Sequence, residues 1–280
     1  MISTPKSTSS LRILADQALP KLWAKHFPGE KQPSNSLGRL FAKDVTWWDV
    51  FVASDIGAER NLIADKLVPR GAEVLDVGCG RGYFSFACTK RDAHVTAIDL
   101  MDGEGRTGWW NEFKRTSELL GVSGLASGVR ASATLFPFTR EHFDLVASVH
   151  SIRNFGGKEE IRLFFHEAKR VMHPGGRLFI VESDLESAGP AYGAFYSMRT
   201  KLGWELRLPS IPELIRWLRN EGFSKTSDES FETNLEYAPV YFRFDPASMK
   251  DIRRDYNAAM KLHARIRERS PPVFVLTAIR

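Results

Sequence analysis

The residues best placed to do chemistry form a short run in which an acidic residue precedes alternating glycines. Asp76 lies inside the end of the short apolar run Val74–Val77, and three glycines follow this run: Gly78, Gly80 and Gly82. A second apolar run, His94–Ile98, ends directly before Asp99. Glycine allows a tight turn and close approach of the backbone to a ligand. The pattern predicts a ligand site at the carboxyl ends of two parallel strands, with two carboxylates beside a glycine loop.

Dinucleotide-binding enzymes also place glycines between their first strand and first helix. The spacing here is GxGxG rather than GxGxxG, and Asp76 would repel a pyrophosphate. Both differences argue against a dinucleotide. The alternative, a turn that serves only helix–strand packing, leaves the register of Asp76 and Asp99 unexplained.

Alternating apolar patterns predict the elements that position this loop. Short apolar runs predict strands at 74–77, 94–98, 143–149, 178–181 and 273–279. Apolar residues at helical spacing predict helices at 11–27, 56–67, 110–120, 161–172, 210–222 and 249–266. We further expect Pro20 to interrupt the first helix, 28–38 to be a loop, and His173–Gly176 to end the 161–172 helix. Ser210 and Glu213 predict a capping box. Such alternation predicts an α/β fold with a doubly wound parallel sheet.

The glycine run and the two carboxylates resemble the class I S-adenosylmethionine-dependent methyltransferases over residues 55–223 and the last strand. The resemblance implies a Rossmann-like, seven-stranded, mostly parallel sheet and S-adenosyl-L-methionine as cofactor. It implies that Asp99 accepts hydrogen bonds from the ribose hydroxyls and that Asp76 meets the ammonium group, directly or through water. It also implies glycines at the loop because a side chain would occupy the cofactor's volume.

The same resemblance assigns further cofactor contacts. Leu100 and Met101 follow Asp99 and could pack on adenine, although core packing is an equal alternative for Met101. Ser132 and Ala133 align with the family's Asp-Ala-x-x-Leu-Pro-Phe stretch, with Ser132 in place of the aspartate that bonds adenine. Ser148, at the end of the 143–149 strand, completes the expected cofactor residues.

The tripeptide Ile152-Arg153-Asn154 and the turn Pro174-Gly175-Gly176 are similar to the ubiquinone/menaquinone-biosynthesis C-methyltransferase branch. Methyl transfer needs an acceptor nucleophile aligned with the methyl group and a base that removes or holds its proton. His150 could be that base or a packed histidine. Arg153 could stabilise a developing oxyanion, or form an ion pair that closes its loop.

Segments outside the core could cover the acceptor. We expect a helical N-terminal extension or cap at 1–54, a methyltransferase domain at 55–280, and covering insertions at 185–209 and 236–269, the latter a helical insertion before the last strand. Trp47-Trp48 and Ala191–Tyr196 supply aromatic side chains for an apolar or aromatic acceptor. Alternatively, they dock their helices on the domain.

Composition bounds the remaining possibilities. The 280 residues are 43% hydrophobic and 26% charged, which excludes a disordered or coiled-coil chain. No apolar run is long enough to span a membrane, and the N-terminus lacks a secretory pattern. Two cysteines provide neither a disulfide framework nor a zinc site, and the histidines lack metal-ligand spacing. We therefore expect a cytoplasmic protein that uses no metal.

Net charge is +5, and it gathers at the ends of the chain. Residues 1–40 hold six basic and two acidic residues, and residues 248–269 hold seven and three. These segments could contact anionic membrane or nucleic acid, or could simply be solvated helix faces. The sequence therefore favours a methyltransferase acting on a small molecule. An RNA or protein methyltransferase and a non-catalytic cofactor-binding regulator stay open as alternatives.

Overall fold

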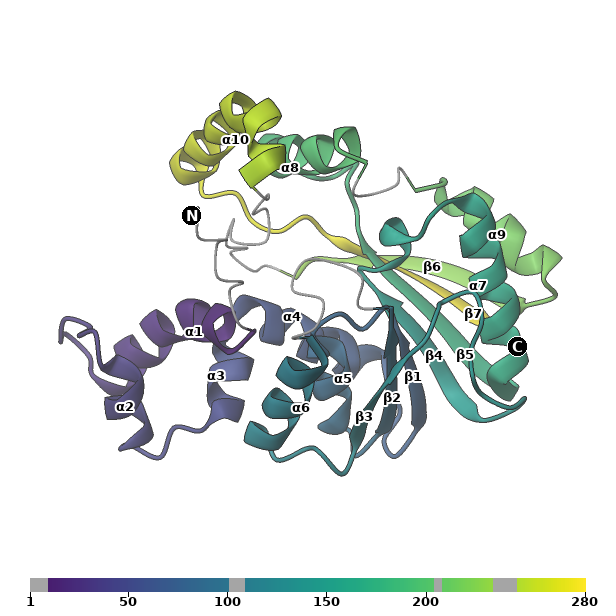
Figure 1. Cartoon of the computed structure of the whole chain (residues 1–280), viewed down its shortest axis with the longest axis horizontal. Helices are drawn as coiled ribbons and strands as arrows, with labels where there is room; N and C mark the ends of the chain where they lie inside the picture. The colour runs from purple at the N-terminus through teal and green to yellow at the C-terminus, as the bar shows by residue number, and fades with distance from the viewer. Residues whose placement is uncertain (1–9, 101–108, 204–207, 234–245) are drawn as a thin grey trace.

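The structure is a computed structural model that describes residues 10–100, 109–203, 208–233 and 246–280. Its centre is a seven-stranded sheet with the order β3-β2-β1-β4-β5-β7-β6 (Figure 1). The strands are β1 (Glu73–Val77), β2 (His94–Asp99), β3 (Ala126–Arg130), β4 (Phe143–Val149), β5 (Met172–Ser183), β6 (Ser224–Phe231) and β7 (Val273–Ile279). Strands β1 to β5 are parallel, and β7 runs antiparallel to both β5 and β6. This confirms the predicted fold class.

Helices cover both faces of the sheet (Figure 1). Side chains of α1 (Ser10–His26), α4 (Asp55–Leu67), α5 (Tyr83–Thr89) and α6 (Trp109–Leu119) pack with one face. Side chains of α7 (Lys158–Val171) and α9 (Ile211–Asn220) pack with the other. The chain winds outward from β1 in both directions, to β2 and to β4. The carboxyl ends of these strands therefore meet at a topological switch point, where ligands bind in open α/β sheets.

The N-terminal helices share the core of the sheet. Buried side chains of α1, α2 (Ser36–Phe41) and α3 (Trp47–Ala53) belong to the same hydrophobic cluster as Val74 and Leu145. The predicted helical extension is thus present. The boundary at residue 54 stays a prediction, because this cluster continues across it.

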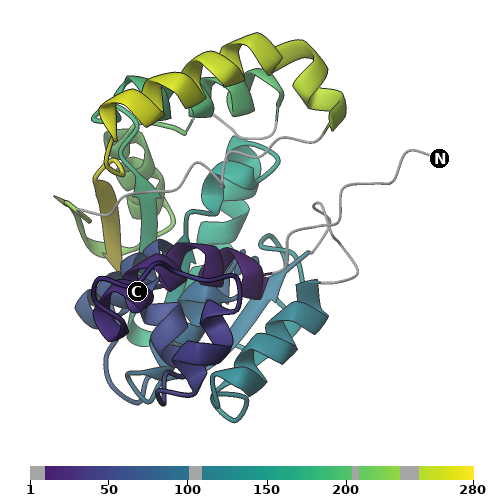
Figure 2. The same ribbon diagram turned by 90° about the vertical axis from the view of Figure 1, so that its left-hand side faces the viewer.

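Two later helices form a unit of their own. α8 (Pro190–Lys201) follows β5, and α10 (Pro246–Ile266) lies between β6 and β7 as the predicted helical insertion. Buried Tyr192, Phe195, Ile252 and Ala259 form a separate small cluster between these two helices. Figure 2 shows α10 running along the outer side of α8. That this unit covers an acceptor stays a prediction.

Several local predictions are wrong. α1 continues through Pro20, because Leu14, Ala18 and Leu22 bury its inner face and this packing outweighs one missing backbone hydrogen bond. Part of the predicted 28–38 loop is helical, since α2 begins at Ser36. The His173–Gly176 stretch lies inside β5, since α7 ends at Val171.

The predicted capping box of α9 does not form. Ser210 is the N-cap residue, but its side chain makes no capping hydrogen bond. Glu213 instead accepts a hydrogen bond from Lys158 Nζ at 3.4 Å. A complete capping box occurs at α3, where Thr46 and Asp49 bond each other's backbone amides. In the described part of the chain, no helix combines the length and apolarity needed to cross a bilayer.

Candidate active site at the carboxyl edge of the sheet

The glycine loop joins β1 to α5 at the carboxyl edge. Gly78, Gly80 and Gly82 have φ values of 72°, 54° and 80°, in the left-handed region that favours glycine. The amide of Gly80 donates to Asp99 Oδ2 at 2.8 Å. The amide of Gly78 donates to the Ile98 carbonyl at 2.8 Å. The end of β2 therefore fixes the loop that follows β1.

Two of the glycines make room for the protein itself rather than for a ligand. A Cβ atom on Gly78 would overlap the Ser151 side chain, and one on Gly82 would overlap the Phe113 ring. The expectation that a side chain at these two positions would fill the cofactor's volume is therefore wrong. The glycines are required because the loop turns sharply against its own neighbours.

The two carboxylates lie in different surroundings. Asp76 is 1% exposed and accepts a hydrogen bond from Ser85 Oγ at 2.5 Å. Burial raises the pKa of Asp76 to about 7, although the Ser85 hydrogen bond opposes the rise. Asp99 is only half-buried. Asp99 is thus the carboxylate accessible to a ligand, and Asp76 lies beneath the loop.

The other predicted cofactor residues surround the same edge. Leu100 is 46% exposed directly after Asp99, and Met101 lies outside the described residues. Ser132 and Ala133 are half-buried, and Ser132 Oγ accepts from the Thr134 amide at 3.1 Å. Ser148 is fully buried, and its hydroxyl has no hydrogen-bond partner among the described residues. A buried hydroxyl without a partner carries a cost that a ligand's polar atom could offset.

His150, immediately after β4, lies in a buried polar network. Its Nε2 is 3.2 Å from Glu59 Oε1 on α4, and its Nδ1 is 3.4 Å from Ser183 Oγ at the end of β5. Ser183 Oγ is in turn 3.3 Å from the Tyr196 hydroxyl on α8. His150 has a φ of 54°, which is strained for a residue with a Cβ atom. α4 and β5 therefore contact this imidazole directly, and α8 reaches it through Ser183.

Glu59 remains ionised within this network. Burial pushes the pKa of Glu59 up, but the positive charge of Arg60 and the hydrogen bonds from His150 and Arg60 outweigh burial and lower that pKa to about 2. Glu59 is 2% exposed and forms an ion pair with Arg60. The carboxylate is therefore available to balance a positive charge on the imidazole.

Arg153 forms the ion pair that was the alternative to a catalytic role. Its Nε donates to Glu182 Oε2 at 2.7 Å, and its Nη2 lies 2.6 Å from the same oxygen. The guanidinium also lies over the Tyr196 ring, 5.1 Å from its centroid. Arg153 is 3% exposed. The structure thus ties the loop after β4 to β5 and α8, and a role for Arg153 as an oxyanion stabiliser stays a prediction.

The aromatic residues expected around an acceptor divide between two places. Tyr192 and Phe195 are buried between α8 and α10, so they hold these helices together, which is the alternative to lining an acceptor site. Tyr196 faces the polar network. Trp48 lies against Lys90, 4.8 Å from its ring centroid, after the C-terminal end of α5. The glycine loop precedes the opposite end of that helix. The structure therefore does not bring Trp48 and Tyr196 together.

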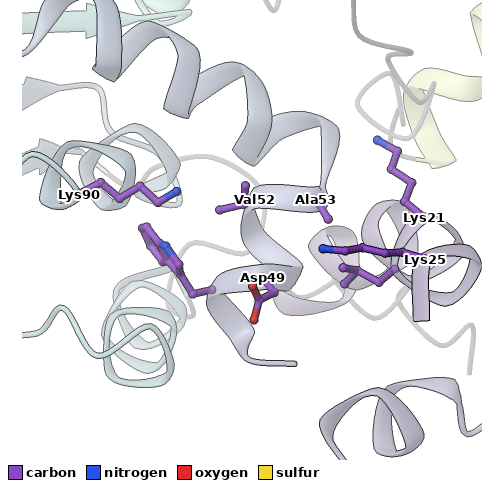
Figure 3. A pocket seen from close by; sticks show the side chains of 8 residues that line it. Lys21, Lys25, Asp49, Val52, Ala53 and Lys90 are labelled. Carbon is purple, nitrogen blue, oxygen red and sulfur yellow. The ribbon is translucent and has the colours of Figure 1, made fainter. Parts of the chain in front are cut away.

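A surface cavity of about 360 Å³ lies beside Trp48 and α3. Figure 3 shows Lys21 and Lys25 on one side of α3 and Lys90 on the other. Since Lys90 follows the end of α5 remote from the glycine loop, this cavity is distinct from the candidate active site. Among the described residues, no group of three or more His, Cys, Asp or Glu side chains has a metal-binding arrangement.

Sequence reasoning missed Glu59 and did not assign Ser183. Glu59 follows Ile56 by three residues and precedes Ile63 by four, so it lies on the apolar face of its helix. An acidic residue at such a position is a signal that was available, because buried carboxylates need partners. Ser183 carries no comparable signal.

Comparisons with known proteins agree with this geometry. A family model described as a methyltransferase domain matches residues 75–180. The ubiquinone/menaquinone biosynthesis C-methyltransferase of Roseobacter denitrificans is 33% identical over 129 residues, which cover 44% of this chain and 47% of that protein. The matches to this relative and to others like it thus span about half of those proteins' length.

Longer matches also occur. The Azotobacter vinelandii protein of the same name is 30% identical over 69% of this chain and 74% of that protein. The ubiquinone biosynthesis O-methyltransferase of Xylella fastidiosa is 30% identical over 67% of this chain and 77% of that protein. The crystal structure of the YcgJ protein from Bacillus subtilis superposes with a TM-score of 0.59 at 16% sequence identity. The match covers 80% of this chain and 98% of the YcgJ chain, and it supports the assignment of the fold. The chain belongs to the class I S-adenosylmethionine-dependent methyltransferases.

Proposed function

We propose that the protein transfers the methyl group of S-adenosyl-L-methionine to a small, largely apolar acceptor that has an ionisable oxygen or carbon. The proposal rests on one observation above all. A histidine bonded to an ionised carboxylate lies at the carboxyl edge of the sheet, next to the glycine loop of a methyltransferase fold. An acceptor with an ionisable proton needs such a group nearby.

The described residues fit the cofactor. Asp99 would accept hydrogen bonds from the ribose, and the exposed Leu100 would contact the adenine face. The Gly78–Gly82 loop would lie along the amino-acid portion, with the Asp76 side chain beneath it. The buried hydroxyl of Ser148, which lacks a partner within the described part of the chain, would supply a further polar contact at this edge. When bound, the cofactor supplies an activated methyl group on a sulfonium.

The acceptor class follows from the surroundings and from the relatives. The names of the relatives include both a C-methyltransferase and an O-methyltransferase of quinone biosynthesis, so carbon and oxygen acceptors both occur among them. In this chain, the polar network of the site ends at the aromatic ring of Tyr196 on α8. This surrounding favours an apolar ring or chain that bears one polar function.

The test is transfer of tritiated methyl groups from the cofactor into a cell extract separated into lipid, small-molecule, RNA and protein fractions. We expect label in the lipid or small-molecule fraction. The Asp99→Ala variant should no longer transfer label to this fraction. Asp65→Ala, which removes an exposed carboxylate from α4, is the control and should transfer label normally. Label found only in RNA or protein would contradict the acceptor class. Normal cofactor binding without label in any fraction would indicate a non-catalytic regulator.

A further inference from the structure

The two ring nitrogens of His150 are both occupied by protein partners. Nε2 faces Glu59 Oε1 at 3.2 Å, and Nδ1 faces Ser183 Oγ at 3.4 Å. Glu182 Oε2 lies farther from Nδ1, at 3.8 Å, and is bonded to Arg153. The imidazole therefore has no nitrogen directed at an acceptor. If His150 takes a proton from the acceptor, the proton must arrive through Ser183.

The partners determine the direction of each hydrogen bond. An ionised carboxylate only accepts, so Nε2 of a neutral His150 carries the hydrogen and donates to Glu59. Nδ1 is then the acceptor and receives the Ser183 hydroxyl hydrogen. Ser183 Oγ in turn accepts from the Tyr196 hydroxyl, at 3.3 Å. All three hydrogen bonds thus run from α8 toward α4, and they end at a negative charge.

We propose that Tyr196 is the catalytic residue that takes the acceptor's proton, and that Ser183 and His150 are the positioning residues that relay it toward Glu59. This inference rests on the proposed function. It narrows the acceptor to a molecule whose reacting group is a hydroxyl, which is methylated on oxygen or, as its enolate or phenolate, on a ring carbon.

The proton transfers balance without a further reactant. The acceptor O–H bond breaks as its proton passes to the Tyr196 oxygen. The Tyr196 proton passes to Ser183 Oγ, and the Ser183 proton passes to His150 Nδ1. The electron pair left on the acceptor forms the bond to the methyl carbon, and the sulfur–carbon bond breaks with its electron pair on sulfur. Glu59 balances the resulting imidazolium charge, and the proton returns to water after the product leaves.

The surroundings hold Tyr196 for this task. The Arg153 guanidinium lies over its ring at 5.1 Å, and Arg153 is held by the buried Glu182. A cation over the ring favours negative charge on the phenol oxygen, which the relay requires transiently. The hydrogen bonds are 3.2–3.4 Å long, and such contacts tighten when a substrate is bound.

The first experiment tests the relay without any acceptor. In protein labelled with nitrogen-15 at histidine, we expect the NMR signals of His150 to show a hydrogen on Nε2 and none on Nδ1. A His150→Gln variant assigns the signals. Ser183→Ala should shift the Nδ1 signal, and Ser183→Thr, which keeps the hydroxyl, should leave it nearly unchanged. A hydrogen on Nδ1 would overturn the relay, because that nitrogen could then accept no proton.

The second experiment measures turnover with the acceptor fraction that the unaltered protein labels. Tyr196→Phe keeps the ring over Arg153 but removes the hydroxyl, so we expect kcat to fall by about 10²-fold with little change in cofactor affinity. The kcat of Ser183→Ala should fall by a similar factor, and Ser183→Thr, which keeps a hydroxyl, should recover part of this rate. Tyr256→Phe is the matched control, since it removes a phenol hydroxyl from the same α8–α10 unit and should keep full activity.

These arms separate the two proposals. An absence of labelled acceptor with the expected His150 signals would contradict the proposed function but leave the relay geometry standing. Full activity in Tyr196→Phe would overturn the relay while the methyltransferase assignment held. A joint loss of activity, cofactor affinity and melting temperature in Tyr196→Phe would make Tyr196 structural and would also overturn the proposal.

Discussion

Asp76 and Asp99 end neighbouring strands, but their surroundings give them different tasks. Asp76 is buried and bonded to Ser85, and Asp99 is half-buried and bonded to the Gly80 amide. A half-buried carboxylate can exchange water for a ligand hydroxyl at little cost, whereas water does not reach a fully buried one. At the scale of single residues, we therefore assign ligand contact to Asp99 and support of the loop to Asp76.

Replacing Asp99 by alanine should weaken cofactor binding by about 1.5–3 kcal/mol, since a charged hydrogen-bond acceptor is lost. Titration calorimetry with S-adenosylmethionine measures this change. Asp65→Ala, an exposed change on α4, is the control and should bind normally. Unchanged affinity in Asp99→Ala would refute the assignment of Asp99.

Two glycines with similar φ values make a matched pair for stability. Gly78 and Gly71 have φ values of 72° and 68°, but a Cβ atom would overlap Ser151 at Gly78 and would meet nothing within 4 Å at Gly71. Gly71→Ala should cost about 1 kcal/mol, from backbone strain alone. Gly78→Ala should cost a further ~1–3 kcal/mol from overpacking. Urea unfolding compares the two, and equal losses would show that packing at Gly78 does not matter.

Asp76 should make the unfolding free energy depend on pH. Its pKa is raised from 3.8 to about 7 by burial, so the folded protein retains a proton that the unfolded chain releases. Its stabilising contribution is complete below pH 3.8 and is lost as pH rises toward 7. Asp76→Asn removes this titration. As pH rises from 3.8 toward 7, the unfolding free energy of the unaltered protein should therefore decrease relative to that of the variant. Parallel curves from pH 4 to 8 in urea unfolding would contradict the raised pKa.

At the scale of elements, α8 depends on a distant residue for its N-terminus. Its N-cap is Gly189, which offers no side chain. Glu268, after α10, accepts hydrogen bonds from the Ala191 and Tyr192 amides at 2.9 and 3.1 Å. A carboxylate at a helix N-terminus both accepts these amides and complements the helix dipole. Glu268 thereby joins the two helices of the insertion unit and holds the helix that bears Tyr196.

Glu268→Ala should loosen α8, because two amide groups lose their acceptor. We expect faster hydrogen exchange across Pro190–Lys201, corresponding to a loss of about 1–2 kcal/mol in local stability. The central strands should keep their protection, since the α8–α10 unit has a separate hydrophobic cluster. Glu118→Ala on α6 is the control. A uniform increase in exchange over the whole sheet would contradict a local role for Glu268.

At the scale of the whole molecule, α10 carries a one-sided charge pattern. Its inner face buries Ile252 and Ala259 against α8. Four basic residues share the exposed, opposite face at helical spacing, namely Lys250, Arg254, Lys261 and Arg265, and Arg253 is exposed on the flank. The acidic residues Asp251 and Asp255 lie to one side of this stripe by the same spacing. The helix lies at the outer side of the molecule (Figure 2), and contact of this stripe with an anionic membrane stays a prediction.

We therefore expect the protein to bind vesicles of phosphatidylcholine with phosphatidylglycerol, and binding to weaken as salt is added. Arg254→Glu with Lys261→Glu should reduce this binding by about 30-fold or more, at about 1 kcal/mol for each cation removed. Lys114→Glu with Arg115→Glu on α6 makes the same charge change on a helix that packs beside β3, and should have little effect. Equal losses of vesicle binding in the α10 and α6 double variants, or binding of the protein only to RNA, would contradict a lipid-facing α10.

Repeating local patterns in the sequence were sufficient to predict the fold and the glycine loop. Buried strands such as β1 and β4 are nearly all apolar, and amphipathic helices such as α7 repeat every three to four residues. The edge strands β3 and β6 were missed for the complementary reason. Their side chains are largely exposed and polar, so backbone pairing to β2 and β7 forms these strands without an apolar pattern in the sequence.

Only the tertiary structure decided what the candidate catalytic residues contact. His150 meets a carboxylate 91 positions away and a serine 33 positions away, and Arg153 meets a carboxylate 29 positions away. Each residue type was readable in the sequence, but its partner was not, because the order of the strands brings the ends of β4, β5 and α8 together. A local pattern reports what a residue's neighbours along the chain favour, whereas hydrogen bonds form between atoms that folding places within about 3 Å of each other.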